Sequence, residues 1–183
     1  MNSTLVQFDF DNTMTIGNVS EKLHSQFGPS SWNDIFDDYK NKLISVEESN
    51  IYSFKNFNVP KLDIDKFISE NISFRKGIVD LIKYLKIKKY EIKIVSSGVD
   101  FYIKSCLNLK SINLDSRNVI CGQSIQTDVG MEVKYLDSKN NEIKNDFKFT
   151  YTEQNKKEYN KIIYFGDSFT DIESALISDV IFA

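Results

Sequence analysis

Three short apolar runs place the strongest constraint on how this chain can fold. They are Leu5 to Phe10, Ile92 to Val95 and Ile162 to Phe165, and each ends in small or acidic residues. Runs of this length that are rich in Val, Ile and Phe are typical of strands buried on both faces of a parallel sheet. Segments with helical spacing follow these runs. The alternation predicts an α/β fold with a doubly wound, Rossmann-like parallel sheet.

The segment between the first two runs has a different pattern. From Asn18 to Ile72, apolar residues recur at helical intervals, and Gly28-Pro29-Ser30-Ser31 and Val59-Pro60 interrupt them. We therefore expect residues 18–72 to form a small helical cap inserted after the first strand. Residues 1–17 and 73–183 would form the core.

The part of the chain from Asn118 to Asn145 contains short β-prone pieces separated by turn residues, which predicts one or two hairpins. The stretch from Ile143 to Tyr151, which begins inside this part and runs beyond it, has no clean period of apolar residues. The sequence alone therefore assigns no element to that stretch.

Polar side chains gather where the three expected strands end. The clusters are Asp9-Phe10-Asp11-Asn12-Thr13, Ser96-Ser97-Gly98, and Gly166-Asp167-Ser168 with Asp171. In an open α/β sheet, ligands bind in the crevice beyond the carboxyl ends of the strands. Four carboxylates converging there would be costly without a cation. Oxygen ligands favour a hard ion, and Mg²⁺ in particular also keeps waters and phosphate oxygens in its shell.

The spacing of Asp9 and Asp11 suits phosphate ester hydrolysis. Residues two apart in an extended backbone point to the same side, so one carboxylate can attack phosphorus while the other handles the proton. An aspartate nucleophile divides the reaction into formation and hydrolysis of an aspartyl phosphate. Ser96 and Ser97 offer hydroxyl donors to the phosphate, or cap the next helix. Gly98, expected where that helix begins, offers backbone N–H groups.

These motifs together resemble those of the haloacid dehalogenase superfamily. The segment from Asp9 to Thr13 is similar to its DxDxT motif, Ser96 to its second motif, and the segment from Gly166 to Asp171 to its GDSxxD motif. The helical insertion is similar to the cap of the phosphoserine phosphatase branch. Within that branch, the segment from Ser96 to Tyr102 resembles the SGGMDFF segment of phosphatases acting on 2-hydroxy-3-keto-5-methylthiopentenyl-1-phosphate.

The resemblance implies a role for each of these residues. It implies that Asp9 is the nucleophile and a Mg²⁺ ligand, and that Asp11 is the acid and base, whose carbonyl also binds the metal. Asp167 would be a second carboxylate ligand, and Asp171 would orient the lysine or a metal-bound water, completing the metal site. Lys148 is chosen as the lysine that binds phosphate, from a set of candidates that also includes Lys144, Lys156 and Lys157.

Two departures bear on the substrate. Asn18 stands where phosphoserine phosphatases carry a glutamate for the substrate's amino group, and the stretch from Glu47 to Ser53 lacks their cap arginine. Phosphoserine is therefore a poor candidate, and a small phosphorylated metabolite of another kind is expected. Phosphoryl transfer, as in mutases of the superfamily, and a catalytically decayed metal- or phosphate-binding protein stay open as alternatives. A dehalogenase is disfavoured because those enzymes lack the aspartate present here as Asp11.

The charge balance and the lengths of the apolar runs limit the classes of partner that this chain can be expected to bind. The chain has 23 basic and 26 acidic residues, a net charge of −3, which gives no broad cationic field for nucleic acid. No apolar run approaches the length of a membrane helix, and the first residues do not resemble a signal peptide. We expect a cytoplasmic enzyme, a monomer or homodimer, whose partner is a small phosphate ester.

Cys106 and Cys121 form no metal or redox motif and are expected to be buried thiols.

Overall fold

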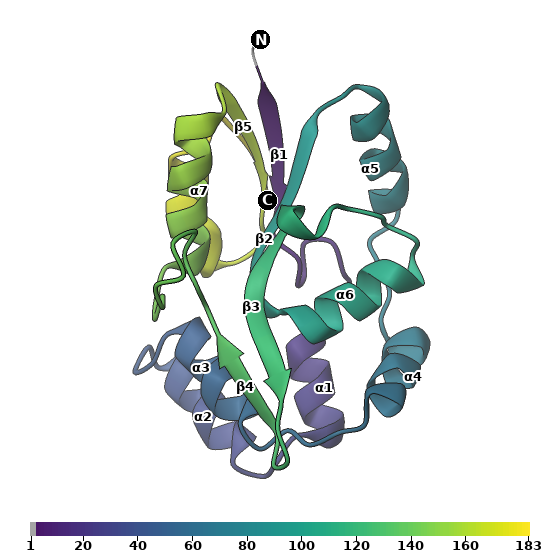
Figure 1. Cartoon of the computed structure of the whole chain (residues 1–183), viewed down its shortest axis with the longest axis vertical. Helices are drawn as coiled ribbons and strands as arrows, with labels where there is room; N and C mark the ends of the chain where they lie inside the picture. Colours follow the sequence, from purple (N-terminus) through teal and green to yellow (C-terminus); the bar gives the residue numbers. More distant parts are fainter. Residues whose placement is uncertain (1–2) are drawn as a thin grey trace.

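A computed structural model describes residues 3–183 and contains a single six-stranded sheet (Figure 1). The strand order is β4-β3-β2-β1-β5-β6. The α/β fold expected from the sequence is confirmed, although the sheet is mixed, because β4 runs antiparallel to β3 while the other neighbours are parallel. The strands are β1 (Thr4–Phe8), β2 (Glu91–Val99), β3 (Val119–Gln126), β4 (Met131–Lys134), β5 (Lys161–Phe165) and β6 (Val180–Phe182).

Helices cover both faces of the sheet. In Figure 1, α7 (Phe147–Glu158) lies on one side, and α5 (Ile78–Ile87) and α6 (Asp100–Leu109) lie on the other. Because both faces are covered, the central strand is buried along its length, and Leu5, Val6 and Phe8 have no exposed surface. The short helices η2 (Phe169–Asp171) and α8 (Ile172–Leu176) follow β5, and η1 (Ser116–Asn118) precedes β3.

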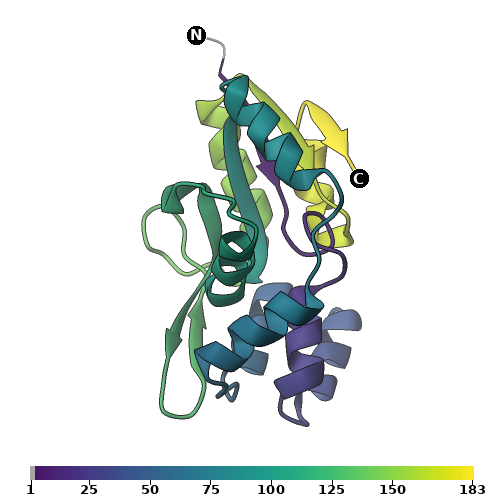
Figure 2. The ribbon, with the colours of Figure 1, turned by 90° about the vertical axis from the view of Figure 1, so that its right-hand side faces the viewer.

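Four helices gather beyond the carboxyl end of β1, and we call them the cap helices (Figures 1 and 2). His24 is the polar residue at their centre, 3% exposed, with its ring stacked on Trp32 at 5.5 Å, as a packing residue would be. The segments that lead into and out of the helices pair at Thr15 and Phe74. The division at residues 17/18 and 72/73 stays a prediction. The cap helices are α1 (Val19–Phe27), α2 (Trp32–Lys40), α3 (Val46–Phe54) and α4 (Lys61–Asn71).

Helix α7 begins inside the stretch from Ile143 to Tyr151, which had no clean period, and continues to Glu158. Its buried face includes Lys148, Thr152 and Asn155, and polar residues on a buried face erase the pattern that signals an amphipathic helix. Gln7 in β1 satisfies two of them: its amide donates to Thr152 Oγ1 at 2.7 Å and accepts from Asn155 Nδ2 at 2.8 Å. This buried hydrogen-bonded set fixes α7 against the central strand.

The remaining elements follow local signals. The expected hairpin is formed by β3 and β4, and its turn is closed by a hydrogen bond from Thr127 N to Gly130 O at 2.8 Å. Cys106 and Cys121 are buried and unpaired, as expected. Across residues 3–183, no helix is both long and apolar enough to span a bilayer.

Candidate active site

Asp9 lies directly after β1, and its side chain is almost completely buried, at 5% exposure of the residue. Its Oδ2 atom is 3.5 Å from the Lys148 Nζ atom. Burial raises the pKa of Asp9 to about 7; Lys148 opposes the rise, and Asp171 and Asp11 add to it. A buried carboxylate with this pKa needs a positive neighbour to be charged at neutral pH.

Lys148 is the lysine that the fold brings to the acidic cluster. It lies in the first turn of α7, is 3% exposed, and donates to Asp171 Oδ1 at 2.6 Å. Burial alone would lower its pKa, but Asp9 and Asp171 raise the pKa above its ordinary value, so the ammonium stays charged. The competing Lys156 and Lys157 pair elsewhere, with Asp179 at 2.7 Å and Glu153 at 3.3 Å. Lys144 lines a neighbouring cleft without reaching this cluster.

Asp11 is held by one donor on each carboxylate oxygen. The Val19 N–H, at the start of α1, donates to Oδ1 at 2.6 Å, and the Tyr102 hydroxyl donates to Oδ2 at 2.7 Å. Burial raises the pKa of Asp11 to about 6, while these two donors lower it. The carboxyl group is thereby fixed in direction and titrates near neutral pH.

The second motif makes contacts that differ from those expected. Ser96 is 1% exposed and its Oγ accepts from the Gly98 N–H at 3.0 Å, whereas the Ser97 hydroxyl donates to Glu47 at 3.0 Å. Gly98 lies in the last residues of β2 and α6 begins at Asp100, so the expected helix start was two residues early.

Only glycine fits at position 98. A Cβ atom placed on Gly98 would lie 2.3 Å from the Tyr102 hydroxyl oxygen and 3.1 Å from Asp11 Oδ2. Position 98 is therefore kept free of a side chain so that the Tyr102–Asp11 hydrogen bond can form.

Asp171 has both carboxylate oxygens engaged. Its Oδ1 accepts from Lys148 and from the Tyr164 hydroxyl at 2.7 Å, and its Oδ2 accepts from the Ser168 N–H and hydroxyl at 3.0 and 2.9 Å. Burial raises the pKa of Asp171, but Lys148 and the hydrogen bonds from Tyr164 and Ser168 together bring that pKa below its ordinary value. Asp167, by contrast, is exposed, and its Oδ1 accepts from the Thr13 hydroxyl at 2.9 Å.

The acidic residues fit a divalent cation. Asp9, Asp167 and Asp171 can each place one carboxylate oxygen so that all three lie within 4.8 Å of one another. Burial raises the pKa of Asp9 despite Lys148, and partial burial of its carboxyl group also raises the pKa of Asp167, so a further cation would favour the ionised form of both. An all-oxygen donor set of this kind suits Mg²⁺. Asp171 fits least as a direct ligand, because ligation would displace its present donors.

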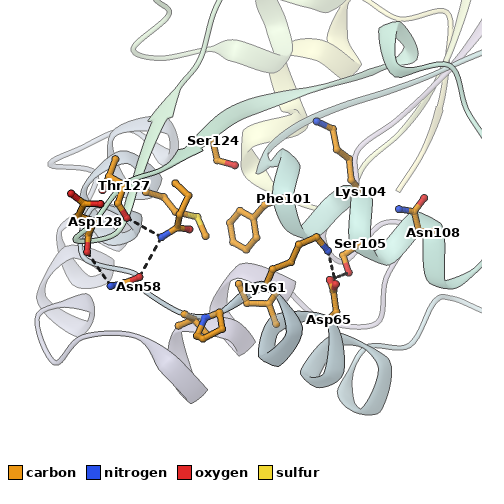
Figure 3. A pocket seen from close by; sticks show the side chains of 15 residues that line it. Asn58, Lys61, Asp65, Phe101, Lys104, Ser105, Asn108, Ser124, Thr127 and Asp128 are labelled. Atoms are coloured by element: carbon orange, nitrogen blue, oxygen red, sulfur yellow. Dashed lines mark hydrogen bonds and ion pairs between the residues drawn. The ribbon is translucent and has the colours of Figure 1, made fainter.

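A cavity of about 300 Å³ brings these residues together. The predicted residues Asp9, Asp11, Ser96, Ser97, Gly98, Lys148 and Asp167 line it, and Asp171 lies directly behind Lys148. The cap side of the cavity carries the rings of Trp32, Phe36 and Tyr39. A larger cavity of about 730 Å³ lies between α4, α6 and the β3–β4 hairpin (Figure 3), and none of the predicted site residues line it.

Three residues that contact the site carry no signal in the sequence. Tyr102 and Tyr164 read as apolar positions of a helix and a strand, although their hydroxyls hold Asp11 and Asp171. Glu47 reads as a surface acid at the start of a helix, although it is 1% exposed. Each acts across elements distant in sequence, and local patterns do not report such contacts.

Comparisons with known proteins show which enzymes the chain is similar to. No family model matches the chain. A 2-hydroxy-3-keto-5-methylthiopentenyl-1-phosphate phosphatase of Bacillus pumilus is 25% identical over 100% of this chain and 80% of the relative. One of Exiguobacterium is also 25% identical, over 99% of this chain and 84% of the relative.

Solved structures agree with the fold. A phosphoserine phosphohydrolase-like protein from Francisella tularensis matches with a TM-score of 0.66 and 24% identity, over 94% of this chain and 81% of that one. A substrate-bound phosphoserine phosphatase matches with a TM-score of 0.72 and 18% identity, over 99% and 85% of the two chains. The chain has the fold of the phosphoserine phosphatase-like haloacid dehalogenase hydrolases. The expected enzyme class, a phosphoric monoester hydrolase, is confirmed by its curated homologues, which are named phosphatases.

Proposed function

We propose that this haloacid dehalogenase-type enzyme hydrolyses a small phosphate monoester with Mg²⁺, through an aspartyl phosphate formed on Asp9. The observation that carries the proposal is the buried pair of Asp9 and Lys148 at the end of β1, 3.5 Å apart. A carboxylate in this position can reach a phosphorus atom in the cavity, and the ammonium beside it lowers the pKa of that carboxylate, which favours the ionised form that attacks.

The two steps assign a task to each side chain. The Asp9 carboxylate attacks phosphorus, the bond from phosphorus to the ester oxygen breaks, and that oxygen takes a proton from Asp11. A water molecule then gives its proton to Asp11 and attacks the phosphorus of the aspartyl phosphate, which frees Asp9 and releases inorganic phosphate. The pKa of Asp11, about 6, suits a group that must both give and take a proton near neutral pH.

The remaining residues hold the phosphoryl group and the charge around it. Lys148 and the Ser96 hydroxyl line the cavity and can bind phosphoryl oxygens. Asp9, Asp167 and the carbonyl of Asp11 would hold Mg²⁺, which supplies charge neutralisation to the phosphoryl group. For Asp171 we propose a positioning role, since its oxygens fix Lys148.

The cap side of the cavity favours a leaving group with an uncharged, apolar part. Three aromatic rings line it together with the charged side chains of Glu21 and Lys40, and both arginines of the chain, Arg75 and Arg117, lie outside the lining. The aromatic part of this wall suits the apolar end of a short carbon chain. We therefore propose a substrate of the kind named for the curated relatives, a phosphorylated short-chain ketone with a thioether end, over phosphoserine.

The decisive experiment is turnover of p-nitrophenyl phosphate with and without Mg²⁺ by the native protein, Asp9→Asn and Asp80→Asn. Asp80 is an exposed acid on α5 and serves as the matched control. We expect Mg²⁺-dependent turnover that Asp9→Asn lowers by about 10³-fold or more and that Asp80→Asn leaves unchanged.

Two results would contradict the proposal. Undiminished Mg²⁺-dependent turnover in Asp9→Asn would remove the nucleophile assignment. Absence of turnover by the native protein across a panel of phosphate esters, with Mg²⁺ and phosphate still bound, would instead favour a binding protein. The same panel, run with the thioether ketone phosphate and phosphoserine side by side, tests the substrate.

A further inference from the structure

Glu47 is a buried acid that joins the cap helices to the core. It lies in the first turn of α3, is 1% exposed, and accepts from the Ser97 hydroxyl at 3.0 Å and from the Phe147 N–H at 3.3 Å. Burial raises the pKa of Glu47, and the two core donors oppose that rise. A carboxylate taken this far from water is costly unless its partners are in place.

The same face of α3 also holds the backbone of Ser97. Asn50, three residues after Glu47, donates from Nδ2 to the Ser97 carbonyl at 2.8 Å and to the Tyr135 hydroxyl at 2.9 Å. Ser97 is thus fixed through both its hydroxyl and its carbonyl by one helix. Because Ser97 lies between Ser96 and Gly98, its position sets where these neighbours face the cavity.

The second donor, Phe147, is the first residue of the helix that carries Lys148. The residue before it, Asp146, has a left-handed backbone, with φ of 58°, and its own side chain makes no capping hydrogen bond. Glu47 supplies an acceptor at this helix start from another part of the chain, where a negative charge also complements the helix dipole. The next residue is Lys148, so Glu47 contacts the backbone immediately before the proposed phosphate-binding ammonium.

We propose that Glu47 is a positioning residue of the phosphoryl site, and this inference rests on the proposed phosphatase function. Through one carboxylate, the cap sets both Ser97 of the second motif and the start of the helix bearing Lys148. If the cap helices move away from the core, both hydrogen bonds break together. The phosphate-binding groups are therefore fully placed only when the cap is closed, which ties closure to chemistry.

The test compares Glu47→Ala and Glu47→Gln with Glu48→Ala. Glu48 is the next residue of the same helix, but its side chain accepts from the Ser45 N–H at 3.0 Å and caps α3 itself. With p-nitrophenyl phosphate and Mg²⁺, we expect Glu47→Ala to lower kcat by roughly 10- to 100-fold with little change in KM. Glu47→Gln keeps an acceptor oxygen and should recover part of that loss, and Glu48→Ala should keep the native kcat.

A second readout separates positioning from simple loss of folded protein. Orthovanadate mimics the phosphoryl transition state, so misplaced Ser97 and Lys148 should weaken vanadate inhibition about as much as kcat falls, while inorganic phosphate inhibition changes less. Partial unfolding would lower kcat and leave the vanadate inhibition constant of the remaining enzyme unchanged. That result would overturn the inference, as would equal losses in Glu48→Ala or a native kcat in Glu47→Ala. If Asp9→Asn loses turnover while Glu47→Ala keeps the native kcat, the positioning role of Glu47 is overturned and the proposed phosphatase function stands.

Discussion

The hydroxyl of Tyr102, in α6, donates a 2.7 Å hydrogen bond to Oδ2 of Asp11, which lies 91 residues earlier in the chain. This contact lowers the pKa of Asp11, whereas burial, the larger effect, raises it to about 6. The proton affinity of the proposed acid and base is therefore set partly by a tyrosine in another element.

Replacing Tyr102 by phenylalanine should raise the pKa of Asp11 further, because it removes a hydrogen bond that lowers this pKa and leaves the effect of burial less opposed. We expect the limb of the kcat/KM profile that reports Asp11 to move to higher pH, and kcat to fall by about 10-fold. The measurement is a pH–rate series from pH 5 to 9 with p-nitrophenyl phosphate. Tyr84→Phe, at an exposed position of α5, is the control. An unmoved profile would show that Tyr102 does not tune Asp11.

Gly98→Ala should disturb the same hydrogen bond, because its Cβ would lie 2.3 Å from the Tyr102 oxygen and force the ring to shift. We expect a loss of kcat of the same order as in Tyr102→Phe. Since both substitutions break one contact, the double variant should lose less than the sum of the two free-energy changes, whereas independent effects would add. Steady-state rates of the four proteins in the cycle decide between these outcomes.

Lys148→Met should lower kcat by roughly 10²- to 10³-fold, because it removes the ammonium that faces the transferred group. The same change leaves Asp9 and Asp171 without their buried cation, so the protein should also melt at a lower temperature. Lys144→Met is the matched control at the other candidate lysine of this region. Equal kcat losses in the two variants would refute the assignment of Lys148.

Binding of Mg²⁺ should stabilise the protein more at pH 8 than at pH 5.5. Burial raises the pKa of Asp9 to about 7, so at pH 5.5 the metal must displace a proton. The metal-free protein should show the opposite trend with pH. Because the pKa of Asp9 is raised on folding, Asp9 contributes stability that is fully present below its unfolded pKa of 3.8 and is lost as pH rises through about 7.

Melting temperatures at both pH values, with and without Mg²⁺, measure this linkage. In Asp9→Asn the pH dependence of the Mg²⁺ shift should shrink, because residue 9 no longer exchanges a proton for the metal. A shift of equal size at pH 5.5 and pH 8 in the native protein would contradict the prediction.

The sequence by itself determined the three central strands β1, β2 and β5 and the acidic groups near their carboxyl ends. Apolar runs report strands buried on both faces, and the position of Asp9 directly after such a run is a local property of the sequence. Asp11 was expected in extended backbone but lies in the turn that follows β1. The position of Asp167, just after β5, could likewise be predicted without knowing any distant contact, whereas Ser96 was expected at the end of its strand and lies inside β2.

The tertiary structure decided between Lys148, the lysine chosen from the sequence, and its competitors, and it alone revealed which residues support that lysine. The position of Lys148 follows from α7, whose polar buried face gives no apolar period and is fixed by Gln7, 145 residues from Thr152. Tyr102, Tyr164 and Glu47 likewise act through contacts between different elements. Periodicity and spacing encode which face of an element is buried, but not what the buried polar groups meet there, and that pairing exists only after the elements have packed.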